Sequence, residues 1–359
     1  MTRLALIGDA TLATAYSRVN AAWLRGLRAA GYHIVGDAPD VIVHHDYRQH
    51  FATCAVPPAP RRIAVRTWDF GPFPRSWTAR IGSDFDRLWV HSAWVREKAV
   101  ESGVDAGLID VVPHGIDPGV FRPDGPVAGK PGAFTFLFVG AAVVRKGVDI
   151  LLRAYAKAFD AGDDVRLILK AHSSDVFYQG QQLSDAIAAF EADPRTPPLE
   201  LIDAFLPDDG LAALYRAADV GVFPYRAEGF AIPILEAMAC GLPCIVPRFG
   251  ACLDYCTHGN AIFVEARRIR LPVGREMAFN SFGFRDRVEA VDFCEVPVDA
   301  LAAALRAAYD MRDDARRALG AAASRTVHEG WTWNHAVSRL GALLCAVHVQ
   351  RETVAYPDA

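Results

Sequence analysis

Residues 134–159, FTFLFVGAAVVRKGVDILLRAYAKAF, decide the fold. The run Phe134–Val139 is apolar almost throughout, which predicts a strand buried on both faces. Gly140 ends this strand, and after a short loop the apolar residues recur at helical spacing over residues 148–159. A buried strand followed by a helix is the repeating unit of a parallel sheet covered by helices.

The same alternation extends in both directions along the chain. Toward the N-terminus we expect strands at residues 4–7, 33–35, 41–44, 63–65, 87–90 and 111–113, and helices at 19–30 and 93–102. Toward the C-terminus we expect strands at 166–170, 200–205, 220–223, 244–246 and 261–264, and a final helix at 333–349. Residues 115–132 are rich in Gly, Pro and Asp, which predicts a linker between two α/β domains of nucleotide-binding type.

Composition excludes several classes of protein. The 359 residues are 52% hydrophobic and 22% charged, unlike a disordered chain, a collagen-like repeat or a disulfide-rich miniprotein. The net charge of -4 argues against a nucleic-acid partner. No apolar run has the length of a membrane span, and the apolar start is too short for a signal peptide, so we expect a cytoplasmic protein. Seven cysteines, an odd number, do not suggest a disulfide framework.

Two segments of the second half carry residues suited to a nucleotide ligand, although the chain has no Gly-x-Gly-x-x-Gly and no P-loop. Arg145 and Lys146 open a helix directly after a strand–loop turn, where backbone amides and cations can meet an anion. They are also the residues expected of an ordinary exposed basic loop. Lysines are few: only Lys98, Lys130, Lys146, Lys157 and Lys170 occur among the 38 basic residues.

The other segment places two carboxylates eight positions apart, at Glu228 and Glu236. Glu228 lies in a glycine-containing loop, where Gly229 permits close backbone approach to a ligand. Glu236 lies one turn inside a helix and has apolar neighbours in sequence, so it needs hydrogen-bond donors, and ribose hydroxyls are suitable ones. A surface glutamate on an amphipathic helix is the alternative.

Four motifs in this order resemble the retaining, nucleotide-sugar-dependent glycosyltransferases of family 4, which have the GT-B fold. The resemblance covers most of residues 86–264 and is most specific in its last motif. The motifs are residues 113–123 (PHGIDPGVFRP), 139–154 (VGAAVVRKGVDILLRA), 214–224 (LYRAADVGVFP) and 228–243 (EGFAIPILEAMACGLP).

The resemblance implies two Rossmann-like domains whose parallel sheets face each other across a cleft. The N-terminal, acceptor-side domain would span residues 1–122 and be completed by a C-terminal helix within 332–359. The domain that binds the nucleotide-sugar would span 123–331. The implied activity is metal-independent transfer of a hexose from a nucleotide-diphosphate sugar to a hydroxyl of a glycan, a lipid or a small molecule, with no cofactor and no metal site.

The resemblance also implies roles for individual residues. Glu236 would bind the ribose, and Glu228 with Gly229 and Phe230 would face the transferred sugar. Lys146 would contact the diphosphate. The remaining donor-binding residues are Gly8, Gly140, Arg145 and Ala231. Of these residues, we expect Glu228 and Lys146, together with Asp69, to be catalytic.

One position departs from the family pattern. The family usually has an arginine directly after the glycine matched by Gly140, and here that residue is Ala141. Arg145 is the candidate to replace its charge. If it does not, the chain is a catalytically weak or silent subunit that binds a sugar nucleotide or a glycan. An epimerase or a phosphorylase of the same architecture fits residues 228–243 less well.

The acceptor side offers fewer signals. Residues 66–77 resemble a Trp-Glu-…-Pro-x-x-Trp segment of some family members, with Asp69 in place of Glu; a packing loop is the alternative. His44, His45 and Asp46, at a strand end, are a second set of possible polar ligands.

For three further features we expect a structural explanation or find only weak support for a function. The spacing of Cys240, Cys244, Cys252 and Cys256 is loosely that of a zinc site, but buried thiols explain it better. The arginine-rich residues 267–289 are expected to form an irregular solvated loop rather than a functional flap. Arg61, Arg62 and Arg66 give weak support for peripheral membrane contact.

Overall fold

The computed structural model describes residues 2–11, 14–46, 51, 53–129, 132–171, 183–272 and 290–352, and side chains up to residue 345. Contacts divide the chain into two compact units. The first unit comprises Met1–Thr67, Ser76–Gly115 and Trp331–Ala359, and the second comprises Trp68–Arg75 and Ile116–Gly330. We expected one boundary after residue 122, whereas the contacts end the first unit at Gly115 and assign residues 68–75 to the second unit.

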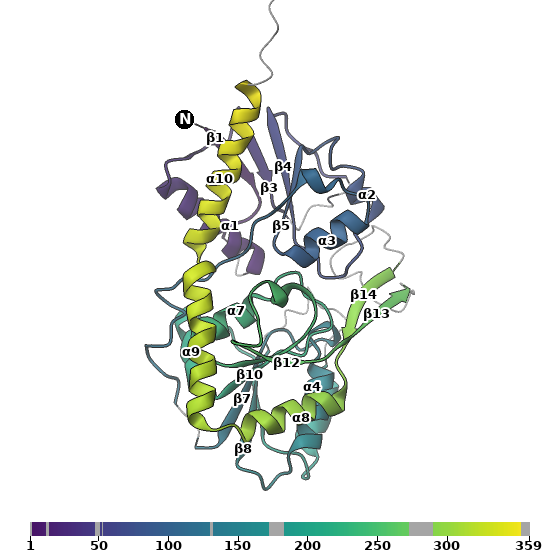
Figure 1. Cartoon of the computed structure of the whole chain (residues 1–359), viewed down its shortest axis with the longest axis vertical. Coiled ribbons are helices and arrows are strands. Elements are labelled where there is room, and N and C mark those ends of the chain that lie inside the picture. Colours follow the sequence, from purple (N-terminus) through teal and green to yellow (C-terminus); the bar gives the residue numbers. More distant parts are fainter. Residues whose placement is uncertain are drawn as a thin grey trace, which may run out of the picture. The chain divides into compact units, whose positions relative to one another are not determined.

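The first unit is built on a six-stranded parallel sheet in the order β2-β1-β3-β4-β5-β6 (Figure 1). The strands are β1 (Arg3–Ile7), β2 (His33–Ile34), β3 (Val41–His44), β4 (Arg61–Arg66), β5 (Arg87–Val90) and β6 (Ile109–Val111). The helices are α1 (Ala15–Ala29), α2 (Arg75–Thr78), α3 (Ala93–Glu101) and α10 (Trp333–Glu352), with a 3-10 turn η1 (Ala106–Leu108). These elements confirm the alternation predicted from the sequence.

The C-terminal helix α10 packs in the first unit against α1, although more than 300 residues separate the two helices in sequence. A Cβ atom at Gly26 of α1 would lie 2.3 Å from Val337 Cγ2 of α10. The Tyr32 hydroxyl, just after α1, donates to the Gly341 carbonyl at 3.3 Å. Gly26 therefore permits the close approach of the two helices. Among the described residues, no helix is both long and apolar enough to cross a membrane.

The second unit repeats the parallel architecture, with strand order β12-β11-β10-β7-β8-β9. Its strands are β7 (Phe134–Val139), β8 (Val165–Lys170), β9 (Leu199–Ile202), β10 (Val220–Val222), β11 (Cys244–Pro247) and β12 (Ile262–Val264). Its helices are α4 (Val148–Ala158), α5 (Ser184–Ala192), α6 (Asp208–Ala217), α7 (Ile232–Ala239), α8 (Val298–Tyr309) and α9 (Asp313–Gly330), with 3-10 turns η2 (Val144–Lys146) and η3 (Gly250–Asp254).

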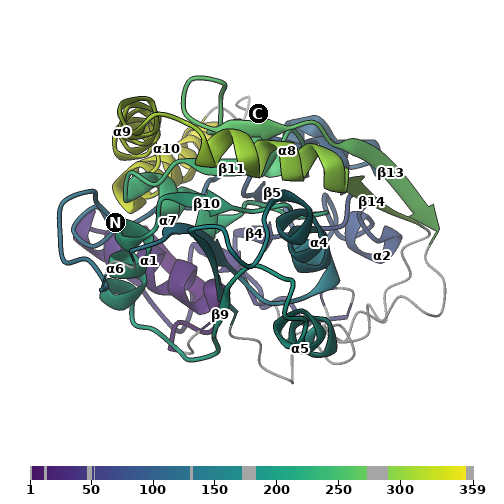
Figure 2. The ribbon, with the colours of Figure 1, turned by 90° about the horizontal axis from the view of Figure 1, so that it is seen from below.

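A buried apolar core fixes the central strand β7. Phe136 and Phe138 are fully buried in one cluster with residues of α4, β8 and α8. Helices α4 and α8 pack side by side, as both views show (Figures 1 and 2). Burying large aromatic side chains on a central strand stabilises its position, so the loop that follows β7 starts from a rigid element.

A two-stranded antiparallel ribbon, β13 (Arg267–Pro272) with β14 (Ala290–Glu295), also belongs to the second unit. The expectation of an irregular loop is therefore wrong for residues 267–272, and residues 273–289 lie outside the described part. Within the ribbon Ile269 pairs with Phe293 and Leu271 with Val291. These apolar cross-strand pairs alternate with arginines, which is the period of a strand with one covered face.

Three buried histidines meet in the first unit. The rings of His91 and His114 have centroids 3.9 Å apart, and those of His45 and His91 are 5.5 Å apart. His44 and His45 are buried, so the predicted strand-end ligands do not form an exposed polar set. Burial, together with neighbouring histidines, lowers the pKa of His45 and His114 well below 6.5. Burial likewise lowers the pKa of His91 to about 4.

We expect the chain to lose stability in mild acid. Since the folded-state pKa values lie below the ordinary value, the unfolded chain binds more protons below about pH 6.5. The stabilisation is complete above that pH and is lost as the pH falls toward the folded pKa, about 4 for His91. For His91 the loss of stability between pH 6.5 and 5 should be roughly 1.5 kcal/mol, and the downward shifts at His45 and His114 act in the same direction. Urea unfolding followed by tryptophan fluorescence measures this.

The variants His91→Gln and His33→Gln test the source of this pH dependence. His33 is exposed on β2. Replacing His91 should reduce the slope of unfolding free energy against pH, and replacing His33 should leave the slope unchanged. Equal slopes in all three proteins would contradict the assignment to the buried cluster.

Candidate active site

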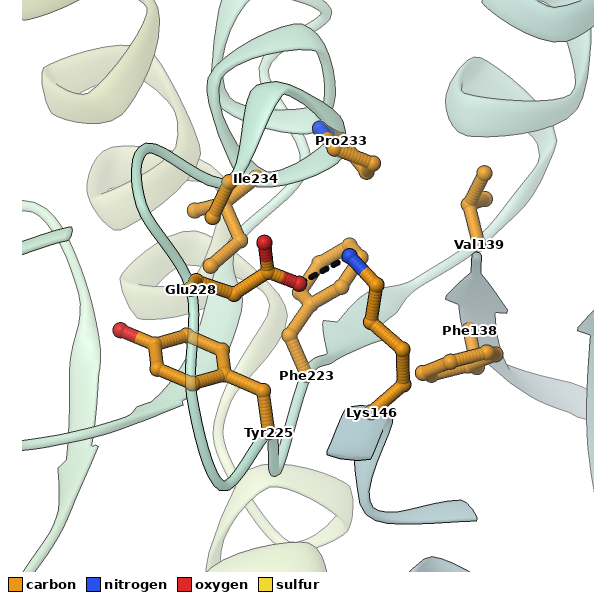
Figure 3. A pocket seen from close by; sticks show the side chains of 9 residues that line it. Phe138, Val139, Lys146, Phe223, Tyr225, Glu228, Pro233 and Ile234 are labelled. Atoms are coloured by element: carbon orange, nitrogen blue, oxygen red, sulfur yellow. Dashed lines mark hydrogen bonds and ion pairs between the residues drawn. The ribbon is translucent and has the colours of Figure 1, made fainter. Parts of the chain in front are cut away.

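Four charged side chains form a compact network in the second unit, which we name the charge network: Asp69, Arg145, Lys146 and Glu228. Arg145 NH1 lies 3.1 Å from Asp69 Oδ2 and 3.5 Å from Glu228 Oε1. The Lys146 ammonium donates to Glu228 Oε1, as the dashed line in Figure 3 shows. Arg145 is 8% exposed and Glu228 9%, so solvent screens these pairs weakly. The two cations and two carboxylates balance.

The loop after β7 positions the two cations. The 3-10 turn η2 carries Arg145 and Lys146, and Gly147 then adopts the left-handed conformation with φ +77° before α4 begins. A Cβ atom on Gly147 would lie only 2.0 Å from the Pro224 carbonyl oxygen. The segment leading to Glu228 therefore passes directly over this glycine. Arg226 N donates to the Arg145 carbonyl at 2.8 Å, which joins the two segments by backbone as well.

A second ion pair, outside the charge network, holds the segment leading to Glu228 against the start of α4. Arg226 donates to both carboxylate oxygens of Asp149, in the first turn of α4, at 2.7 and 2.8 Å. Burial raises the pKa of Asp149, but hydrogen bonds and the positive charge of Arg226 outweigh it, so the net shift is downward. A carboxylate in the first turn also interacts favourably with the helix dipole. The sequence motifs did not point to this pair.

The segment Trp68–Arg75 brings the carboxylate of Asp69 into the network, although its neighbours in sequence belong to the first unit. The Gly229 amide donates to Asp69 Oδ1 at 2.7 Å, while Oδ2 faces Arg145. The ribbon secures the same segment, because Asp292 N donates to the Phe70 carbonyl at 2.9 Å. The contacts therefore group Asp69 with the domain that we expected to bind the donor, and not with the acceptor side.

Helix α7 begins beside this network with a strained residue. Its N-cap Ala231 has φ +67° and ψ +58°, a left-handed conformation that is unusual for a residue with a Cβ, and no side chain caps the helix. The Tyr255 hydroxyl lies 2.8 Å from the Phe230 carbonyl oxygen and 3.1 Å from that of Ala231, which restrains the turn. Pro233 has no N–H and the Ile234 amide donates to the Ala231 carbonyl at 3.1 Å, so what the start of α7 offers an anion is the positive end of the helix dipole.

A small hollow, partly open to solvent, lies between these elements (Figure 3). Lys146 and Glu228 meet at its polar side, and apolar side chains form the rest of its wall. The lining residues are Phe138, Val139, Lys146, Phe223, Tyr225, Glu228, Ala231, Pro233 and Ile234. The hollow thus joins a cation, a carboxylate and the start of α7 at the carboxyl ends of β7 and β10, where ligands bind in open α/β sheets.

Glu236 lies deeper, on α7, and is 2% exposed. The Tyr215 hydroxyl of α6 donates to Glu236 Oε2 at 3.2 Å. Burial and the nearby Glu236 carboxylate raise the pKa of Tyr215 well above 10, so the tyrosine stays a neutral donor. We expected this carboxylate to need hydrogen-bond donors, and Tyr215 supplies one.

The remaining predicted residues are placed as follows. Gly140 follows β7 directly, and its amide donates to the Lys170 carbonyl at 3.0 Å. Gly8 follows β1 in the first unit, where a Cβ atom would lie 2.2 Å from the His45 carbonyl oxygen. Ala141 is buried and brings no charge.

The structure offers no arrangement of cysteines for a metal among the residues it describes. No group of three or more His, Cys, Asp or Glu side chains there is placed to hold a metal ion. Cys240, Cys244, Cys252 and Cys256 are buried thiols. Burial raises the pKa of Cys240 to about 12, which keeps it protonated and unreactive.

Three of the four network residues, Arg145, Lys146 and Glu228, lie in a part of the chain that matches a known family. A family model described as "Glycosyl transferases group 1" matches residues 133–270. The chain carries a group 1 glycosyl transferase domain. This agrees with the resemblance to family 4 seen in the sequence.

Curated relatives match the chain over part of their length. The D-inositol 3-phosphate glycosyltransferase of Segniliparus rotundus is 34% identical over 161 residues, 41% of this chain and 33% of that protein. The protein of the same name from Geodermatophilus obscurus is 28% identical over 254 residues, 64% of this chain and 54% of that protein. The chain spans between a third and about half of the length of these two relatives.

Solved structures show the fold of the whole chain. Sucrose-phosphate synthase from Thermosynechococcus elongatus superposes with a TM-score of 0.68 and 17% identity, covering 98% of this chain and all of that one. Anabaena HepE, solved with UDP and glucose, has a TM-score of 0.65 and 13% identity, covering 96% of this chain and all of that one. The expectation of a GT-B fold with two Rossmann-like domains is confirmed.

Substituting Gly147 should destabilise the domain. In Gly147→Ala the new Cβ meets the Pro224 carbonyl at 2.0 Å in a left-handed conformation. We expect a loss of at least about 2 kcal/mol in unfolding free energy, measured by chemical denaturation. Gly162→Ala is the control, because its Cβ would meet no atom within 4 Å, and it should change stability by less than about 0.5 kcal/mol. Equal effects would contradict the close crossing.

A double-mutant cycle measures the coupling between Asp69 and Arg145. We expect Asp69→Asn and Arg145→Met to be coupled by at least about 1 kcal/mol in unfolding free energy, because the pair is largely shielded from water. The comparison cycle uses Lys157 and Asp299, an exposed pair with side chains 56% and 78% accessible. Its coupling should be smaller. Additive effects at Asp69 and Arg145 would show that segment 68–75 is not held by this ion pair.

Proposed function

We propose that the protein is a retaining glycosyltransferase that moves a sugar from a nucleoside-diphosphate donor to an acceptor hydroxyl. The single observation that carries this proposal is the charge network beside the start of α7, of which Arg145, Lys146 and Glu228 lie within the residues matched by the group 1 family. In this arrangement Lys146 and the positive end of the α7 dipole stabilise the departing diphosphate electrostatically. Fixed protein charges then perform the work that a metal ion performs elsewhere, so we propose no metal and no cofactor.

The two glutamates take separate parts of the donor. Glu228 and the backbone of Gly229, Phe230 and Ala231 face the hydroxyls of the transferred sugar. Glu236, held by Tyr215, binds the ribose. Its buried carboxylate accepts from Tyr215 at 3.2 Å, and each carboxylate oxygen can accept more than one hydrogen bond, so ribose hydroxyls are suitable donors to it. Asp69, which shares Arg145 with Glu228, is the remaining carboxylate at the reacting centre.

The names of similar proteins guide the choice of substrates. HepE was solved with UDP and glucose, so UDP-sugars are the first donors to test. The curated relatives are named as D-inositol 3-phosphate glycosyltransferases, so a phosphorylated cyclitol is the first acceptor to test, followed by glycans and lipids. A binding subunit without catalysis is the second candidate, favoured by Ala141 in the position of the family arginine.

Calorimetric titration of UDP, GDP, ADP, TDP and CDP tests the donor site. We expect one nucleotide to bind, and Glu236→Ala to weaken it at least tenfold, about 1.4 kcal/mol, through loss of the ribose contact. Glu236→Gln keeps the packing and should also weaken binding, because an amide presents one acceptor oxygen where the carboxylate presents two. Glu265→Ala, an exposed carboxylate paired with Arg248, is the matched control and should leave affinity unchanged.

Three results separate the candidates. Binding with turnover of the corresponding sugar nucleotide supports the transferase. Binding without turnover against every acceptor class favours the binding subunit. Absence of binding by all five nucleotides to folded, monodisperse protein contradicts the transferase and leaves a subunit that binds a glycan.

A further inference from the structure

Lys170 ends β8 beside the candidate site, and the function proposed above does not use it. In the parallel pairing of β7 and β8, Lys170 is the register partner of Val139, and the next amide, Gly140 N, donates to the Lys170 carbonyl at 3.0 Å. Register partners on adjacent strands direct their side chains to the same face of a sheet. Val139 lines the hollow that holds Lys146 and Glu228. Lys170 therefore leaves the sheet on the face of Val139, at the edge where ligands bind.

The Lys170 side chain is buried, with 7% of the residue exposed. Within the ranges that the structure describes, its ammonium makes no hydrogen bond and no ion pair within 4 Å. Burial lowers the pKa of Lys170, and the charge of Asp203, which follows β9, partly opposes that shift. A cation that is shielded from water and has only a distant carboxylate lowers the stability of the folded protein, because a buried charge is stable only when it has partners.

The charge network shows why the site requires another cation. Asp69 and Glu228 already compensate Arg145 and Lys146, and Arg145 NH1 also donates to the Ala227 carbonyl at 2.9 Å. The four side chains sum to zero charge, whereas a nucleoside diphosphate brings about two to three negative charges. Ala141, where relatives of the family usually have arginine, contributes none. A cation that no network carboxylate engages is therefore needed.

We propose that Lys170 binds the phosphates of the nucleotide donor and supplies the second cation that Ala141 does not. This inference rests on the proposed function, because it requires a nucleoside-diphosphate ligand. Lys170 acts as a binding residue: its ammonium donates to a non-bridging phosphate oxygen in a site of low solvent exposure. The family arginine would reach the phosphates from the loop after β7, whereas Lys170 reaches them from the end of the neighbouring strand.

Four proteins test the role of Lys170: wild type, Lys170→Met, Lys170→Arg and the control Lys157→Met. Lys157 lies on α4 and pairs with Asp299 in an exposed position. The ligands are the nucleoside diphosphate that wild type binds and the same nucleoside without phosphate, titrated at several salt concentrations. We expect Lys170→Met to weaken diphosphate binding at least tenfold, with a smaller dependence on salt. Lys170→Arg should stay within about threefold of wild type, since it keeps the charge.

The control measurements distinguish a phosphate contact from a structural role. Nucleoside binding should be the same in wild type and Lys170→Met, and Lys157→Met should behave as wild type with both ligands. Thermal unfolding of Lys170→Met should occur at the wild-type temperature or above, because methionine removes a buried charge at nearly constant volume. Loss of ligand affinity without loss of stability supports the inference.

Two results overturn it in different ways. If wild type binds a nucleoside diphosphate and Lys146→Met weakens that binding, but Lys170→Met leaves it unchanged, Lys170 is not the second cation and the proposed function stands. Equal weakening of diphosphate and nucleoside binding in Lys170→Met also rejects a phosphate contact. If wild type binds no nucleoside diphosphate, the inference and the proposed function fail together.

Discussion

The pairing of two cations with two carboxylates in a shielded place organises the candidate site. Arg145 lies between Asp69 and Glu228, and Lys146 completes the set on Glu228. Because unpaired charges are unfavourable in such surroundings, each member constrains where the other three lie. The backbone is constrained at the same place. A Cβ atom on Gly147 would lie 2.0 Å from the Pro224 carbonyl oxygen, so a glycine is required there for the Glu228 segment to reach the two cations. The site is thus fixed by electrostatics and by one close backbone crossing together.

The sequence patterns predicted the strands and helices well because each pattern arises from interactions between residues that are close together in the chain. The apolar run Phe134–Val139 became the central strand β7, and the helix expected at residues 93–102 is α3, which Ser92 caps through its side chain at 3.2 Å. The placement of Glu228 and Glu236 on a loop and the following helix was also foreseeable, because Pro233 marks the helix start. Such features depend on neighbours within a few residues.

Contacts between distant residues were not predictable in this way. Asp69 bonds Gly229 across 160 positions, and Arg226 bonds Asp149 across 77. Asp69 and its segment pack with the second unit because a carboxylate completes a charge balance there, and no periodicity in residues 66–77 carries that information. The same holds for β13, whose partner strand begins after a long interval of sequence. The arginines of this segment suggested a solvated loop, whereas pairing with the apolar face of β14 makes it a strand.

The charge balance has a mechanistic consequence under the proposed function. In the free protein the carboxylate of Glu228 is occupied by Lys146, and a diphosphate competes for that ammonium. Binding the diphosphate draws Lys146 away and leaves Glu228 able to accept hydrogen bonds from the hydroxyls of the attached sugar. A nucleoside diphosphate without sugar would then leave Glu228 with Arg145 but without Lys146 or sugar hydroxyls in a shielded place, which is less favourable. The network therefore favours the intact sugar nucleotide over the released diphosphate, and this difference promotes departure of the product after transfer.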